Sequence, residues 1–123
     1  MAAADALRRR GPWRALLALM LAVVSWFAFA PVQFDDGDLP LDKGRHLVAF
    51  GALTWVAVQA FAPATRGRAV AWRVAAALLA YGVFIELVQS LIPGREASAW
   101  DVLADALGIG LGLLAARVFS VVR

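Results

Sequence analysis

Cysteine is absent from the 123-residue sequence, and its absence excludes disulfides, thiolate metal sites and cysteine nucleophiles. No low-complexity linker divides the chain and no internal repeat recurs along it, so we predict a single domain over residues 1–123. Apolar residues make up 63% of the sequence, whereas a soluble domain has about 45–50%. This excess must face something other than water, which predicts a small integral membrane protein.

Charge excludes one further class of function. The formal net charge is +3 and the isoelectric point is near 10.6, values that would also fit a nucleic-acid-binding protein. The arginines, however, flank apolar runs instead of forming a stripe on a soluble face. We therefore predict no nucleic-acid partner.

Four apolar segments run over about 13–30, 44–62, 74–92 and 100–119. Each is close to the roughly 20 residues that cross a hydrocarbon core, which predicts an all-α, four-helix transmembrane bundle. The first segment resembles a secretory signal peptide, but its apolar region is longer than the usual ~7–15 residues. Pro31 also follows Ala30 directly, a poor place for cleavage, so we interpret this segment as an uncleaved span.

Basic and acidic residues lie on opposite sides of such a four-span chain. Eight of the nine acidic residues lie on one side. Nine of the twelve basic residues lie on the other, namely Arg8, Arg9, Arg10, Arg14, Arg66, Arg68, Arg73, Arg117 and Arg123. Because cytoplasmic flanks carry an excess of Lys and Arg, we predict that both the N and C termini are cytoplasmic.

Polar side chains within the predicted spans gather towards the external side. Glu86 and Gln89 lie three residues apart, so they share one helical face. A carboxylate at the centre of a bilayer costs roughly 2.5–3.5 kcal/mol, so Glu86 is a candidate functional residue. The topology predicts an outward-facing binding pocket formed by Asp42, Lys43, His46, Glu86, Gln89, Arg95, Asp101 and Asp105.

Several of these residues also have a purely structural interpretation. Ser98 and Asp101 fit a capping box, and Asp42 fits a helix N-cap, so capping is an alternative for both acids. Gln89 is suited to a hydrogen bond with a neighbouring helix. Glu86 and Asp105 lie too deep for capping. We expect Arg95, Arg45, Lys43 or His46 to pair with them.

Two further features have alternatives. Ala104, Gly108 and Gly112 form a small-residue stripe, which favours packing against another span of the same chain, while an oligomer through Gly108 and Gly112 stays open. The donor types of His46, Glu86, Asp101 and Asp105 would allow a metal ion. One histidine with carboxylates is an unusual zinc set, so we predict no metal and no cofactor.

Three blocks of sequence resemble the VanZ-like family of small bacterial membrane proteins. The blocks are D-K-G-R-H-L-V-A-F (42–50), E-L-V-Q-S-L-I-P-G-R (86–95) and D-V-L-A-D-A-L-G (101–108). The family pattern is roughly D-K-x-x-H-x-x-x-F, E-x-x-Q with a following P-x-R, and D-x-x-x-N-x-x-G. The resemblance covers about residues 40–112. Asp105 departs from the pattern, since the family more often has Asn there.

The resemblance implies a multi-pass protein of the bacterial cytoplasmic (inner) membrane, in a family whose founding member is associated with low-level teicoplanin resistance. We expect a non-catalytic envelope protein whose pocket binds a membrane lipid head group, a lipid-linked cell-wall precursor, a glycopeptide or a partner. The alternative is an enzyme acting on a lipid-linked substrate, with His46 and Glu86 as acid and base and with Lys43 and Arg95 holding a phosphate. An ion pathway is disfavoured because the cytoplasmic halves are apolar.

Overall fold

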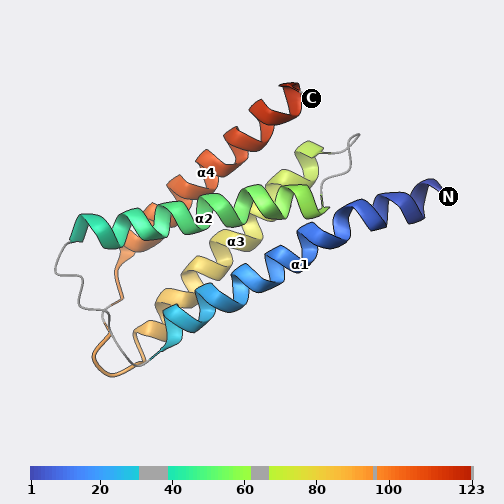
Figure 1. Ribbon diagram of the computed structural model, residues 1–123. Helices are drawn as coiled ribbons and strands as arrows, with labels where there is room; N and C mark the ends of the chain where they lie inside the picture. The colour runs from blue at the N-terminus through green and yellow to red at the C-terminus, as the bar shows by residue number, and fades with distance from the viewer. Residues whose placement is uncertain (31–38, 62–66, 96, 123) are drawn as a thin grey trace.

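The computed structural model describes residues 1–30, 39–61, 67–95 and 97–122. Within these ranges the chain forms four α-helices and no strand: α1 (Ala2–Phe29), α2 (Leu39–Phe61), α3 (Gly67–Gln89) and α4 (Ala99–Val122) (Figure 1). The predicted all-α class is confirmed. Every helix begins before its predicted apolar segment, and in α1, α3 and α4 the added residues include alanine or arginine, which are good helix formers.

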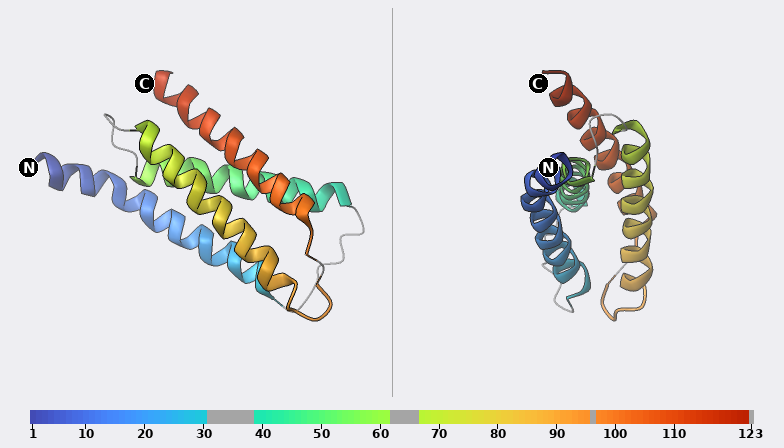
Figure 2. Two further views of the ribbon diagram at one scale, coloured as in Figure 1. Left: turned by 180° about the vertical axis from the view of Figure 1, so that it is seen from behind. Right: turned by 90° about the vertical axis from the view of Figure 1, so that its right-hand side faces the viewer.

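Successive helices run in opposite directions, as Figures 1 and 2 show. The two termini therefore lie at the same end of the molecule. At the opposite end α1 and α3 end, and α2 and α4 begin; we call this the site end. Predicted pocket residues from three different helices are brought to it by this alternation.

Helix α2 is the central helix, since it makes the most extensive contacts with the other three, above all with α4. Its buried side chains form much of the apolar core, and they are Phe50, Leu53, Val56, Ala57 and Ala60. A helix that is covered on several sides needs few apolar side chains facing lipid. The first turns of α2 can therefore hold Lys43, Arg45 and His46.

Three helices, α1, α3 and α4, contain stretches long and apolar enough to cross a membrane. These stretches are Ala2–Phe29, Arg68–Gln89 and Ala99–Phe119. Large apolar side chains cover their outer faces, for example Leu19, Leu87 and Leu107, which are all more than half exposed. The structure is thus that of a membrane protein. The four predicted helices are confirmed. By length and hydropathy α1, α3 and α4 qualify as membrane spans, and α2 does not.

The backbones of α2 and α4 approach closely at a set of glycines. A Cβ atom on Gly112 would lie 2.5 Å from the carbonyl oxygen of Gly51, and one on Gly108 would collide with the carbonyl oxygen of Leu47. The small-residue stripe of α4 therefore packs against α2 of the same chain, the arrangement favoured by the sequence. An oligomer through Gly108 and Gly112 stays a prediction.

Two arginines of the N-terminal flank bind the end of α2. Arg10 donates a hydrogen bond from Nη1 to the carbonyl oxygen of Phe61 at 3.2 Å, and Arg14 donates from Nε to that of Ala60 at 3.3 Å. Helix C-termini carry unsatisfied carbonyl groups and a partial negative charge, so arginines are favourable there. These contacts hold the first half of α1 against α2.

Candidate functional site

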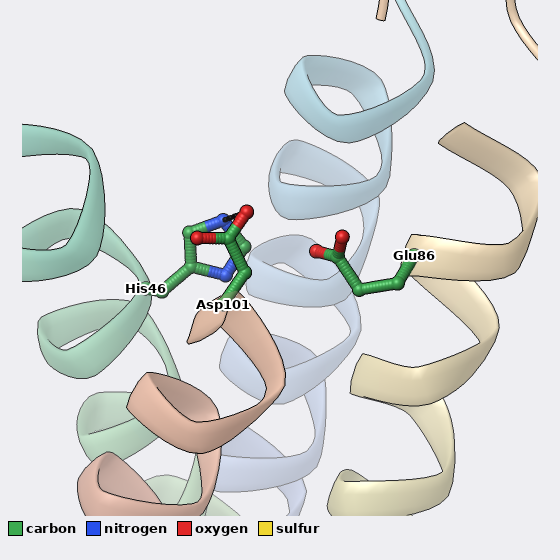
Figure 3. Close-up of side chains that lie close together, drawn as sticks. All are labelled: His46, Glu86 and Asp101. Atoms are coloured by element: carbon green, nitrogen blue, oxygen red, sulfur yellow. Dashed lines mark ion pairs between the residues drawn. The ribbon is translucent and has the colours of Figure 1, made fainter. Parts of the chain in front are cut away.

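Three helices each contribute one side chain to a cluster at the site end. His46 comes from α2, Glu86 from α3 and Asp101 from α4, and the two carboxylates and the imidazole ring face one another (Figure 3). One nitrogen or oxygen atom of each residue lies within 4.8 Å of the corresponding atoms of the other two. Glu86 and Asp101 are buried, and His46 is partly buried. Residues far apart in the sequence thus meet at one point.

His46 is held in place by a second acid of α4. Its Nδ1 atom lies 2.8 Å from Oδ1 of Asp105, a residue whose side chain is 0% exposed. Its other ring nitrogen, Nε2, lies 3.8 Å from Oδ2 of Asp101. Because a carboxylate only accepts, we assign the proton of this hydrogen bond to Nδ1. The Asp105 contact therefore turns Nε2 towards Asp101.

Gly82 of α3 makes the room that the Asp105 carboxylate occupies. A Cβ atom at this position would lie 2.6 Å from Oδ2 of Asp105 and 3.4 Å from the ring of Phe50. Among the described residues, no group donates a hydrogen bond to that Oδ2 atom, which is buried. The absence of a side chain at Gly82 is thus part of the construction of the site.

Ser98 connects the acids of α3 and α4. Its hydroxyl group caps α4 by accepting the N–H of Trp100 at 3.2 Å, as predicted. In a capping box Asp101 would accept the N–H of Ser98, but Oε2 of Glu86 accepts it instead, at 2.9 Å. Asp101 forms an ion pair with Lys43. The capping-box interpretation of Asp101 is therefore wrong, and its carboxylate is committed to the cluster.

Gln89 and Arg95 reach a different part of the site end, the last turn of α1. Gln89 donates from Nε2 to the carbonyl oxygen of Ala28 at 3.1 Å. Arg95 donates to the carbonyl oxygens of Phe27 and Ala30 at 2.7 and 2.8 Å. Gln89 thus makes the interhelical hydrogen bond that its structural interpretation required, and the guanidinium of Arg95 binds α1. The side chain of Asp42 lies outside the described part of the structure.

A cavity of about 500 Å³ opens beside the cluster, between α1, α2 and α3. Most of its wall is apolar, and its polar wall consists of Arg45, His46, Gln89 and Arg95. The Nε atom of Arg95 is buried and has no hydrogen-bond partner among the described residues. The cavity therefore combines an apolar surface with two guanidinium groups.

The predicted pocket residues divide into two groups. His46, Glu86 and Asp101 form the cluster, which Lys43 and Asp105 contact through Asp101 and His46. Gln89 and Arg95 line the cavity, which His46 also reaches. The sequence did not identify the contribution of α1, which lines the cavity with Val23, Val24, Phe27 and Ala28. Apolar residues within an apolar span carry no distinguishing signal.

These features define a small helical membrane protein with a buried histidine–carboxylate cluster at one end. The chain matches the VanZ/LLP1 family model over residues 14–120, which is nearly its whole length. It therefore belongs to the VanZ/LLP1 family, and the resemblance inferred from the three sequence blocks is confirmed. No curated protein and no solved structure matches the chain significantly.

Proposed function

We propose that this VanZ/LLP1 protein binds an amphiphile with an anionic head group in the cavity at its site end. Phospholipids and lipid-linked cell-wall precursors share this chemistry, a phosphate joined to an apolar tail. In this proposal the chain is a multi-pass protein of the bacterial cytoplasmic membrane, and α2 crosses with the other helices. Both termini are cytoplasmic because arginines gather on their side, so the site end faces outwards.

The composition of the cavity wall carries the proposal. Side chains such as Val23, Phe27 and Ile85 offer an apolar surface to a tail, and Arg45 and Arg95 stand at its polar side. Guanidinium groups match phosphate oxygens in geometry as well as charge. The buried Nε–H of Arg95 has no acceptor among the described residues, which supports a ligand oxygen as its partner. The volume of about 500 Å³ is usual for a ligand site.

Native mass spectrometry of the purified chain tests the proposal with phosphatidylglycerol, phosphatidylcholine and a polyprenyl pyrophosphate. We expect both anionic lipids to be retained more strongly than phosphatidylcholine. Preference for the polyprenyl compound would identify a cell-wall precursor as the ligand, and preference for phosphatidylglycerol would identify a bulk lipid. Equal retention of all three contradicts the proposal.

Two matched pairs of variants locate the binding site. Arg45→Gln should weaken retention of the anionic lipids, while Arg73→Gln, an exposed position of α3 outside the cavity wall, should not. Ala49→Phe fills the cavity, and Ala52→Phe adds the same side chain on an exposed face of α2. Loss of binding in both members of a pair would place the ligand elsewhere.

A catalytic role is the second candidate, and the hydrogen bond between His46 and Asp105 favours it. A histidine oriented by a buried carboxylate is a common general base, and Glu86 lies within reach as a second acid or base. Incubation with a labelled lipid-linked precursor distinguishes the two functions. Turnover that His46→Ala abolishes would establish an enzyme, whereas retention of unchanged lipid would establish a binding protein.

A role in teicoplanin resistance is suggested by family membership alone. The corresponding experiment compares the teicoplanin susceptibility of a bacterial host that expresses the chain with that of a host expressing Arg45→Gln. If the cavity acts in resistance, the wild-type chain raises the inhibitory concentration and the variant does not. An unchanged concentration in both hosts removes resistance from the proposal and leaves lipid binding to be judged separately.

A further inference from the structure

The cluster at the site end has the arrangement of ligands around a metal ion. We infer that His46, Glu86 and Asp101 bind one divalent transition-metal ion, Zn²⁺ or Mn²⁺, through Nε2 of the histidine and one oxygen of each acid. Figure 3 shows the three side chains converging from three helices, with their donor atoms within 4.8 Å of one another. Because the three residues come from separate helices, their donor atoms surround one point instead of lying along one helix face.

The orientation of His46 is the first support. Its Nδ1 atom bonds to buried Asp105 at 2.8 Å, and its Nε2 atom faces Oδ2 of Asp101 at 3.8 Å. Metal-binding histidines usually donate their other ring N–H to a carboxylate or carbonyl, which fixes the ring and raises the basicity of the ligating nitrogen. Asp105 is therefore a positioning residue for the metal ligand.

The second support is an unsatisfied atom of Glu86. This residue is 6% exposed, and Oε2 of its carboxylate accepts the N–H of Ser98. Its other oxygen, Oε1, is buried and has no hydrogen-bond partner among the described residues. Figure 3 shows that the carboxylate points towards His46 and Asp101. A buried carboxylate oxygen without a donor is costly unless a cation satisfies it.

The distances also suit a shared ion. Two ligand atoms that each lie about 2.0–2.2 Å from Zn²⁺ are separated by roughly 3–3.5 Å. The 3.8 Å between His46 Nε2 and Asp101 Oδ2 is slightly longer, as expected for a set that contracts around an ion. Lys43 pairs with Asp101 and offsets one of the three neighbouring carboxylates. A divalent cation supplies the positive charge that balances the other two carboxylates, those of Glu86 and Asp105.

The donor set selects the type of metal. Carboxylate oxygens suit Mn²⁺, Mg²⁺ and Ca²⁺, whereas an imidazole nitrogen suits Zn²⁺ and its neighbours. A mixed set therefore favours Zn²⁺ or Mn²⁺ over Mg²⁺ and Ca²⁺. The sequence analysis predicted no metal, and that prediction rested on the types of the side chains alone. The ring orientation and the unsatisfied Glu86 oxygen are visible only in the structure.

Isothermal titration of the purified, chelator-treated full chain tests the inference, with Zn²⁺, Mn²⁺, Mg²⁺ and Ca²⁺ as probes. His46 is the only histidine, so the affinity tag must contain none. We expect one Zn²⁺ or Mn²⁺ per chain and at least about tenfold weaker binding in His46→Gln and Glu86→Gln. Asp5→Asn, an exposed acid at the other end, is the matched control.

Comparing the metal affinities of the variants with that of the wild type decides the test, provided that the variants fold. Helical circular dichroism verifies that each variant folds, and Glu86→Gln keeps an oxygen for the N–H of Ser98. Equal affinities in wild type and both variants would overturn the site. So would imidazole NMR signals of wild-type His46 that do not respond to Zn²⁺. No lipid is added, so the result does not depend on the proposed lipid binding.

Discussion

Glu86 of α3 accepts the backbone N–H of Ser98, the residue that caps α4, at 2.9 Å. The acid that α4 would normally supply to its own first turn is thus replaced by one from the neighbouring helix. This exchange releases Asp101 to pair with Lys43. The start of α4 and the polar cluster are therefore one structural unit, and a change in Glu86 affects both.

Removing the Glu86 side chain should destabilise the start of α4. In Glu86→Ala the N–H of Ser98 loses its acceptor in a partly buried position, at a cost of about 1–3 kcal/mol. Glu86→Gln retains an oxygen at the same place and should lose much less. Unfolding by sodium dodecyl sulfate, followed by circular dichroism, measures the difference. Leu87→Ala on the exposed face of α3 is the control, and equal losses in Ala and Gln would contradict the capping role.

A methyl group at Gly82 should displace the buried acid that holds His46. The new Cβ would lie 2.6 Å from Oδ2 of Asp105, so Gly82→Ala is expected to destabilise the protein by about 1–3 kcal/mol. Asp105→Ala removes the atom that the methyl group meets. In that background the cost of Gly82→Ala should shrink, and a double-mutant cycle of unfolding free energies measures the coupling. Strictly additive effects would show that the two residues do not share this space.

Asparagine should be able to replace Asp105 as the partner of His46. Its amide oxygen accepts the Nδ1–H that the carboxylate accepts at 2.8 Å, and the family pattern has Asn at this position. We expect Asp105→Asn to keep the His46 tautomer and Asp105→Ala to lose it. Since His46 is the only histidine, the ¹⁵N signals of its ring report the tautomer directly. A change of tautomer in Asp105→Asn would show that the negative charge of Asp105 is required.

Composition and the positions of the apolar segments were sufficient to predict the four helices. The depth of Glu86 and Asp105 within their predicted spans pointed to two of the buried acids, whereas Asp101, which is also buried, could equally have been a helix cap. The sequence offered four candidate partners for Glu86 and Asp105 and could not choose among them, since the choice depends on how the helices cross. Lys43 and Arg95 were equally plausible partners for an acid in the sequence. In the structure His46, one of the candidates, pairs with Asp105. Lys43 pairs with Asp101, and Arg95 binds the end of α1.

Helix α2 shows a second limit of the sequence. Its predicted segment, about 44–62, has the length of a span, yet α2 is not among the helices whose composition meets that measure. Arg45, His46 and Gln59 lower the mean hydropathy of this segment, and the polar side chain of Thr54 is buried within the protein. Mean hydropathy counts every side chain of a helix, including those that face protein and not lipid.

The close approach of α2 and α4 should depend on Gly108. A Cβ atom there would collide with the carbonyl oxygen of Leu47, which belongs to the backbone and cannot rotate away. Gly108→Ala should therefore separate the helices and cost several kcal/mol or prevent folding, since overpacking alone costs about 1–3 kcal/mol. Gly110→Ala is the matched control because nothing lies within 4 Å of a Cβ atom there. Equal unfolding free energies of the two variants would contradict the packing.

The proposed orientation predicts which ends of the helices react with a reagent outside the cell. The chain has no cysteine, so a single cysteine can be introduced without first removing any native cysteine. Ala97 is exposed at the site end, before α4, and Ala3 is exposed in the first turn of α1 at the opposite end. If the site end faces outwards, a membrane-impermeant maleimide should label Ala97→Cys in intact cells.

Under the same conditions Ala3→Cys should be labelled only after the cells are opened. Labelling both variants in opened cells controls for the reactivity of each thiol. The reverse pattern would place the histidine–carboxylate cluster on the cytoplasmic side and the termini outside. This would go against the arginines that flank α1 and α3, which favour cytoplasmic termini. A lipid-linked precursor exposed at the outer surface would then be excluded as the ligand. The metal site would be unaffected, because it depends only on contacts within the chain.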